Sequence, residues 1–276
     1  MFQMLAELFS FTFMVRAIVV GLLVSLCAAL LGVNLVLKRY AMIGTGLSHV
    51  GFAAMAIAGV FDFAPLPVSM PVVVAAAFLL LRLNENNKIR GDSAVALVST
   101  SSLAIGVIVV SMTTGLTLHI CNVMFGSIFA MAQADMYISV ALSIVVLALF
   151  VLFYKQLFAV THDEDFARAT GTKVEVYKSL LAILTAITVV LGMRMMGALL
   201  IASLTLFPAL SAMRLCKRFL SVVITAAVIG VVCFFIGMLF SFGLDLPPGA
   251  SVVAVNLVVF AVFSVIAIIK RGGIAA

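Results

Sequence analysis

Long apolar runs, each about 20 residues, recur along the whole chain and constrain its fold more than any other feature. A helix rises 1.5 Å per residue, so roughly 20 residues cross a hydrocarbon core of about 30 Å. The 276-residue sequence therefore predicts an all-α, polytopic membrane protein with about eight or nine spans, folded as a single transmembrane domain over residues 1–276. The runs cover 14–37, 41–60, 67–83, 93–114, 136–154, 177–193, 196–213, 219–242 and 249–269.

The residue composition fits this fold and excludes several others. Apolar residues make up 66% of the chain and charged residues 9%, against a charged share of about 25% in ordinary globular domains. So few charges cannot solvate a globule of this size, which excludes a soluble enzyme, a disordered chain and a secreted disulfide scaffold. The cysteines lack CxxC spacing, and we expect them to be small packing side chains: Cys27, Cys121, Cys216 and Cys233.

The loop charges predict the orientation in the membrane, because cytoplasmic loops carry an excess of Lys and Arg. If the N-terminus lies outside, the cytoplasmic ends collect all of the 16 basic residues except Arg16 and Arg194. We therefore expect a multi-pass protein of the plasma membrane with a cytoplasmic C-terminus. The net charge of +6 then reflects this asymmetry and not a nucleic-acid partner. The external side carries acidic residues instead: Glu7, Asp62, Asp135 and Asp245.

Two features interrupt the regular pattern of spans. The stretch 116–134 is interpreted as interfacial or re-entrant because of its polar side chains, which are His119, Cys121, Asn122 and Gln133. Two pairs of neighbouring runs are short, so either pair is a candidate for a broken helix: 41–60 with 67–83, and 177–193 with 196–213.

The longest polar interval on the cytoplasmic side is THDEDFARATGTKVEVYK, from Thr161 to Lys178. Thr161 and Glu164 have capping-box spacing, which predicts a short helix from about Asp163 to Thr170 that stops at Gly171. On charge alone, an ordinary solvated loop is the favoured interpretation. The chain has no GxxxxGK[ST] motif and no long soluble segment, so it cannot hydrolyse a nucleotide itself, and a partner must supply any energy.

His49 lies about 8 residues, or about 12 Å, inside the second apolar run, close to the middle of the membrane. An ionisable residue at that depth is a candidate functional residue, and neutral imidazole suits zinc, copper, iron or nickel, and with more oxygen ligands also manganese. Thr45 shares its helix face, and the small residues Gly44, Gly46 and Gly51 let another helix or an ion approach. A structural histidine that bonds across a helix interface is an equally good interpretation of the composition.

Two later segments also stand out. The segment 193–218 combines small residues with Pro208 in mid-span, which predicts a kinked helix at a packed interface or a cavity. Its methionines are expected to pack in the core. The segment 242–257 is an external turn, where Asp245 either attracts a cation or caps a helix.

These segments, in this order, resemble the permeases of ABC importers for divalent metals such as zinc, manganese and iron. KRYAMIGTGLSH at 38–49 is similar to the first motif of that family, and GALLIASLTLFPALSA at 197–212 to its small-residue stretch ending in Pro-Ala. DLPPGASVV at 245–253 looks like its Asp-Leu-Pro-Thr-Gly-Ala signature. DEDFARATG at 163–171 looks like the segment by which importers of the cobalamin and siderophore type dock on their ATPase.

The resemblance implies a type II importer-like permease without enzyme activity of its own and without a covalently bound cofactor. It implies three partners: a second permease copy, a cytoplasmic ABC ATPase dimer that binds ATP, and an extracytoplasmic metal-binding protein. It also implies that the coupling segment, about 161–173, contacts the ATPase through Asp163, Glu164, Asp165, Ala167, Arg168 and Gly171.

One departure from the family pattern concerns the metal. Many members have an Asp four residues before the motif histidine, and here that position is Thr45. His49 carries over as a metal ligand, whereas a carboxylate partner does not. Because the loss weakens the capture of hard cations most, zinc is favoured over manganese or iron(II) as the cargo. Candidate helpers are Thr45, Ser48 and Asn34, and weaker substitutes are Asn256 and His119.

Other classes of membrane protein fit the sequence less well. An ion-coupled secondary transporter needs intramembrane carboxylates, which are missing from the middle of every predicted span. A channel needs a repeated ring of filter groups, and none is recognisable. A metalloprotease needs a ligand pair such as HExxH, whereas His49, His119 and His162 are scattered.

Overall fold

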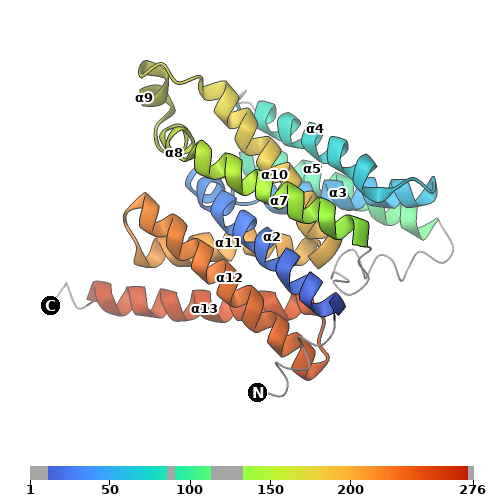
Figure 1. Ribbon diagram of the computed structural model, residues 1–276. Coiled ribbons are helices and arrows are strands. Elements are labelled where there is room, and N and C mark those ends of the chain that lie inside the picture. The colour runs from blue at the N-terminus through green and yellow to red at the C-terminus, as the bar shows by residue number, and fades with distance from the viewer. Residues whose placement is uncertain (1–11, 86–90, 113–132, 273–276) are drawn as a thin grey trace.

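The computed structural model describes residues 12–85, 91–112 and 133–272 (Figure 1). Within these ranges the regular structure is entirely helical, which confirms the all-α prediction. The helices are α2 (Thr12–Leu37), α3 (Ile43–Val60), α4 (Pro65–Glu85), α5 (Gly91–Ser111), α7 (Gln133–Leu152), α8 (Tyr154–His162), α9 (Glu164–Ala169), α10 (Val174–Met196), α11 (Ala198–Leu215), α12 (Phe219–Leu244) and α13 (Pro248–Gly272).

Eight of the helices are long and apolar enough to cross a membrane on their own: α2, α3, α4, α5, α10, α11, α12 and α13. The remaining predicted span, 136–154, coincides with α7. It counts as a span only together with α8, from which α7 is bent by 68°. The short paired runs that were candidates for a broken helix each form an uninterrupted helix. The predicted position of the break was therefore wrong, because the bend lies between α7 and α8.

Three helices form the centre of the bundle. α2, α10 and α11 pack on one another, and α10 also contacts α3, α4 and α7. On one side lie α3, α4 and α5, and on the other side lie α12 and α13 (Figure 1). The central helices bury most of their side chains, whereas α5 and α13 leave mostly apolar side chains exposed, as expected for helices at the edge of a membrane bundle.

The packing of α3 against α5 is close because of a glycine. A β-carbon at Gly106 of α5 would lie 2.6 Å from the ring of Phe52 and 3.2 Å from the Ala53 backbone of α3. Small residues at such a crossing allow two helices to approach closely in a membrane. This crossing places the middle of α5 beside the α3 turn that carries His49.

The structure bears on several smaller predictions. Cys27, Cys216 and Cys233 are free thiols, as expected, and Cys121 lies outside the described residues. The methionines of 193–196 are buried in the core. Asp245 is the C-cap of α12 in the left-handed region, with φ of 51°, so the cap interpretation fits this position. Most of the stretch 116–134, including His119, lies outside the described residues.

Candidate functional site

The first candidate site is the half-buried imidazole of His49 in the middle of α3. Its Nδ1 atom lies 2.6 Å from the Ser99 Oγ of α5, a residue 50 positions away in the sequence. When Nδ1 carries the proton, it donates to Ser99, and Nε2 then presents its lone pair to a ligand. A hydrogen bond of this kind to the second ring nitrogen is typical of metal-binding histidines.

Ser99 was missed by the sequence analysis, although a signal was present. It opens the run Ser99-Thr100-Ser101-Ser102, four consecutive hydroxyl residues inside a predicted span. Thr100 and Ser101 are exposed on α5 and donate their hydroxyl protons back to Ala96 and Leu97 carbonyls at 2.8 and 2.7 Å. Their oxygen lone pairs are then left as acceptors on the outer face of a membrane-spanning helix.

The predicted helper residues take other hydrogen bonds. Ser48 donates to the Gly44 carbonyl at 2.7 Å, and Asn34 lies fully buried in α2, where its Oδ1 accepts from Thr161 at 3.0 Å. Asn256 donates to the Val252 carbonyl within α13. Thr45 is half-buried one turn before His49. A metal-binding role for any of these residues stays a prediction.

The described residues give His49 no cluster of metal-ligating side chains. Among the described residues, no three His, Cys, Asp or Glu side chains lie close enough together to hold a metal ion. The described site around His49 therefore consists of one imidazole and neutral hydroxyl groups.

The second candidate site is the segment α8–α9, and here the capping prediction was wrong. Asp163, not Thr161, is the N-cap of α9, and its side chain accepts from the backbone N–H groups of Asp165 and Phe166, both at 3.0 Å. Thr161 belongs to the last turn of α8, where a residue cannot cap the following helix. Glu164 is likewise engaged elsewhere, in ion pairs with two lysines.

The predicted end of α9 at Gly171 is confirmed. Gly171 has a positive φ of 84°, and the Thr172 N–H returns to the Ala167 carbonyl at 3.0 Å, which closes the helix end. Ala167 is fully buried in a small apolar cluster with Val160 and Val174. α9 therefore rests on α8 and on the start of α10.

The predicted coupling residues divide into an outward and an inward set. Asp163, Asp165 and Arg168 are exposed, and Arg168 pairs with Glu175 at the surface at 3.0 Å. Phe166 is 64% exposed and adds an apolar side chain that was not singled out. Glu164 instead points inward, with Oε1 2.9 Å from Lys38 Nζ and Oε2 2.6 Å from Lys178 Nζ.

The charges around Glu164 lower the pKa of its carboxyl. Partial burial raises the pKa of this carboxyl, but the hydrogen bonds from Lys178 and Lys38 outweigh it and hold the pKa below its ordinary value. Burial lowers the pKa of Lys38, against the opposing effect of Glu164. Glu164 is thus the charged partner that two largely buried lysines share.

Comparison with known proteins identifies the family. A family model described as the ABC 3 transport family matches residues 10–268. The chain belongs to the ABC 3 transport family. The resemblance to importer permeases is therefore confirmed, and with its eight or nine spans the chain is a multi-pass protein of the plasma membrane.

Relatives in the ABC 3 transport family are named for different metals. The chain is 26% identical to the manganese transport system membrane protein MntC of Halalkalibacterium halodurans, over 92% of this chain and 87% of the relative. It is 28% identical to the high-affinity zinc uptake system membrane protein ZnuB of Haemophilus influenzae, over 95% and 98%.

A solved structure shares the fold of this ABC 3 family member. In the structure of PsaBC from Streptococcus pneumoniae in complex with Fab, one chain superposes with a TM-score of 0.84 at 24% identity, covering 95% of this chain and 94% of that chain. The arrangement of helices around α2, α10 and α11 is therefore shared with that solved chain.

Proposed function

We propose that this chain is the permease subunit of an ATP-driven importer of divalent metal ions, with zinc as its cargo. The observation that carries the proposal is the His49 ring in a membrane-spanning helix, with one nitrogen held by Ser99 and the other able to meet an ion. Family membership supports the transport role, and the lack of a nucleotide-binding motif in the sequence supports a separate ATPase.

The choice of zinc rests on the ligands around His49. Imidazole is a good ligand for zinc, whereas manganese prefers hard, anionic oxygen ligands. The residue one turn before His49 is Thr45, whose neutral hydroxyl is a weak ligand for a hard cation. The relative ZnuB is named for zinc, and the relative MntC, named for manganese, supports manganese as the second candidate.

The partners follow from what one chain lacks. A second copy would bring a second His49 to an incomplete site, and it would cover the exposed hydroxyl groups of Thr100 and Ser101, which lipid solvates poorly. An ATPase dimer would dock on the exposed side of α9, and an extracytoplasmic binding protein would deliver the ion. The loop charges favour an external N-terminus and a cytoplasmic α9.

The transport step follows from alternating access. ATP binding closes the ATPase pair and moves α9, and the membrane helices then open toward the other side of the membrane. The His49 nitrogen transiently binds a dication that has lost part of its hydration shell. A neutral site with few ligands releases the ion readily, which favours rapid passage.

The experiment is ATP-driven metal uptake into proteoliposomes that contain the permease, its ATPase and its binding protein. His49→Ala is expected to lower zinc uptake at least tenfold, because the intramembrane nitrogen ligand is lost, while assembly with the ATPase is retained. Ser203→Ala is the matched control, because that buried hydroxyl donates to the Leu200 carbonyl of its own helix at 3.0 Å. Normal zinc uptake by His49→Ala would refute the proposal.

A second variant tests the metal. Thr45→Asp adds an anionic oxygen one helical turn from His49, so the ratio of manganese to zinc uptake is expected to rise. If the unaltered protein already prefers manganese, the zinc assignment is wrong and manganese takes its place.

A further inference from the structure

We infer that Glu164 is a transmission residue, whose carboxylate ties the coupling helix α9 to the two helices that lead to His49, and that it is not a docking contact for the ATPase. The inference rests on the proposed function, since it specifies how motion of the ATPase reaches the metal site. The set Lys38, Glu164 and Lys178 is called the ionic tie below.

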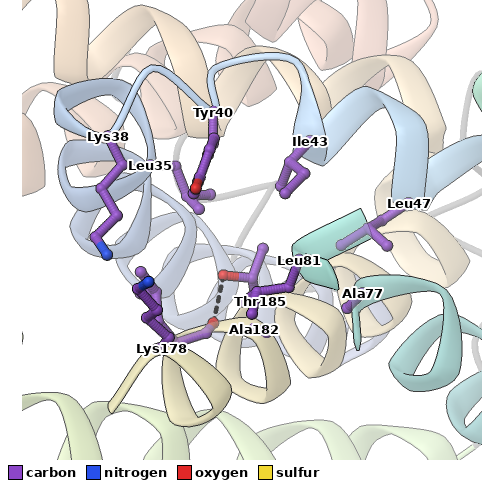
Figure 2. Close-up of a pocket in the computed structure, with 11 residues that line it drawn as sticks. Leu35, Lys38, Tyr40, Ile43, Leu47, Ala77, Leu81, Lys178, Ala182 and Thr185 are labelled. Carbon is purple, nitrogen blue, oxygen red and sulfur yellow. Dashed lines mark hydrogen bonds between the residues drawn. The ribbon is translucent and has the colours of Figure 1, made fainter. Parts of the chain in front are cut away.

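The ionic tie joins three separate parts of the chain. Lys38 follows the end of α2, Glu164 begins α9, and Lys178 lies in the second turn of α10. The side chains of the two lysines are only 6% and 10% exposed, whereas that of Glu164 is 36% exposed. Figure 2 shows the Lys38 and Lys178 amines pointing toward each other at one end of a cavity of about 30 Å³, enough for about one water molecule.

The charge balance explains why the tie depends on Glu164. Two ammonium groups that are this buried repel each other, and each is unfavourable without a nearby carboxylate. Glu164 bonds to both, one oxygen to each. Glu175 is farther away, with Oε1 4.0 Å from Lys178 Nζ, and it is mostly exposed. Removing the Glu164 charge takes away the carboxylate that bonds to both lysines.

The position of α9 is set by its contacts and not by its own stability. A six-residue helix is too short to be stable alone. Its underside is fixed by Ala167, which packs with Val160 of α8 and Val174 of α10. A second polar bond joins the same region to α2, from Thr161 Oγ1 to Asn34 Oδ1 at 3.0 Å. A push on α9 is therefore passed to α2 and α10.

The first route to His49 runs through the connection between α2 and α3. Lys38 lies in this tight turn, where Arg39 has a positive φ of 62° and the Tyr40 N–H returns to the Leu35 carbonyl at 2.8 Å. α3 begins at Ile43, so His49 lies in the second turn after this connection. Movement of Lys38 thus shifts the start of the helix that carries the imidazole.

The second route runs along α10. This helix has 23 residues and a length of about 34 Å, which takes it from the tie across the membrane. Near its far end, Met193 packs where a β-carbon on Gly51 of α3 would collide with it. Gly51 is two residues from His49. The tie is therefore connected to α3, the helix that carries the imidazole, both through the α2–α3 turn and through α10.

The geometry separates docking from transmission among neighbouring acidic residues. Both oxygens of Glu164 are turned inward to lysines, whereas Asp165 and Phe166 are exposed and open to a partner. Loss of the Glu164 charge should therefore leave the ATPase bound while weakening the link between hydrolysis and transport.

The test uses the complete reconstituted transporter with zinc as the probe. Glu164→Gln keeps the shape and removes the charge, and it is expected to lower the metal transported per ATP by about tenfold, within the 5- to 150-fold range of typical couplings. Affinity for the ATPase is expected to stay within about twofold. The control is Asp62→Asn, an exposed carboxylate beyond the other end of α3, which should leave the transport ratio unchanged.

Charge-preserving variants separate a transmission role from a merely structural one. Lys38→Arg keeps the ion pair and should retain the wild-type transport ratio, whereas Lys38→Gln should lower it. If Glu164→Gln does not fold, as judged by size-exclusion chromatography, the contrast between the two Lys38 variants decides the matter. An unchanged transport ratio in Glu164→Gln, or equal ratios in the Lys38 variants, would overturn the inference.

The outcomes also distinguish this inference from the proposed function. If the unaltered transporter moves no metal, the proposed function fails before any variant is compared. If it transports zinc and Glu164→Gln instead loses the ATPase, Glu164 is a docking residue and only the transmission role is refuted.

Discussion

The residue that matters most in this account is a histidine whose depth could be predicted but whose partner could not. The apolar run 41–60 was enough to place His49 near the middle of a span. Ser99 is 50 positions away, and it meets His49 along a helix crossing at which Gly106 lets α5 lie close to α3. Which helices pack together depends on tertiary contacts, and the residue pattern within one helix does not reveal those contacts.

A prediction at this scale concerns the hydrogen bond to the imidazole. Ser99→Ala leaves Nδ1 without its partner, so the ring is less well oriented for a metal. Loss of such a bond usually weakens metal affinity about 10- to 100-fold, and we expect the zinc concentration for half-maximal uptake to rise by a factor in that range. Ser111→Ala removes a hydroxyl at the end of the same helix that donates to the Ile108 carbonyl, and it should change this concentration little. Equal effects of the two variants would contradict the role of Ser99.

Among the elements, α9 shows where local sequence rules succeed and where they fail. The acidic start and Gly171 located the helix to within about a residue at each end. The choice of cap was wrong, because α8 continues through Thr161 and leaves Asp163 as the first residue with extended backbone. The motif alone does not reveal where the preceding helix ends.

The cap gives a prediction of its own. Asp163→Ala removes the acceptor of two backbone N–H groups, and loss of an N-cap typically destabilises a helix by about 1 kcal/mol. Hydrogen exchange at the amides of Asp165 and Phe166 should become several-fold faster, while exchange in the centre of α10 stays the same. Thr161→Val is the comparison. If Thr161 capped α9, this substitution would also speed exchange at the amides of Asp165 and Phe166.

The ionic tie predicts a dependence on pH with a definite sign. The pKa of folded Glu164 lies below its ordinary value of 4.5, so the tie is complete above pH 4.5 and is lost as the pH falls through the lowered value. The mobility of a spin label at Ala169→Cys should therefore be low at neutral pH and rise under acidic conditions. With Glu164→Gln, the label should be mobile at neutral pH already. If acidification raises the mobility of the label by the same amount in that variant, the titrating group is not Glu164.

At the scale of the whole molecule, the spans were predictable and their assembly was not. Long apolar runs predict helix positions, because the backbone N–H and C=O groups of a segment in lipid must bond to one another, as they do in a helix. The bend between α7 and α8, the central place of α10, and ion pairs such as Lys38 with Glu164, 126 positions apart, all depend on contacts between distant segments. The motifs indicated the family, and the structure shows how α8 and α9 are connected to the core.

The proposed function requires that the His49 nitrogen binds the metal within the membrane. The X-ray absorption spectrum at the zinc edge tests this in the assembled transporter, loaded with zinc and held with a non-hydrolysable ATP analogue. We expect imidazole nitrogen at about 2.0 Å from the ion, and loss of this signal in His49→Ala. Zinc bound with the same nitrogen signal in that variant would contradict it.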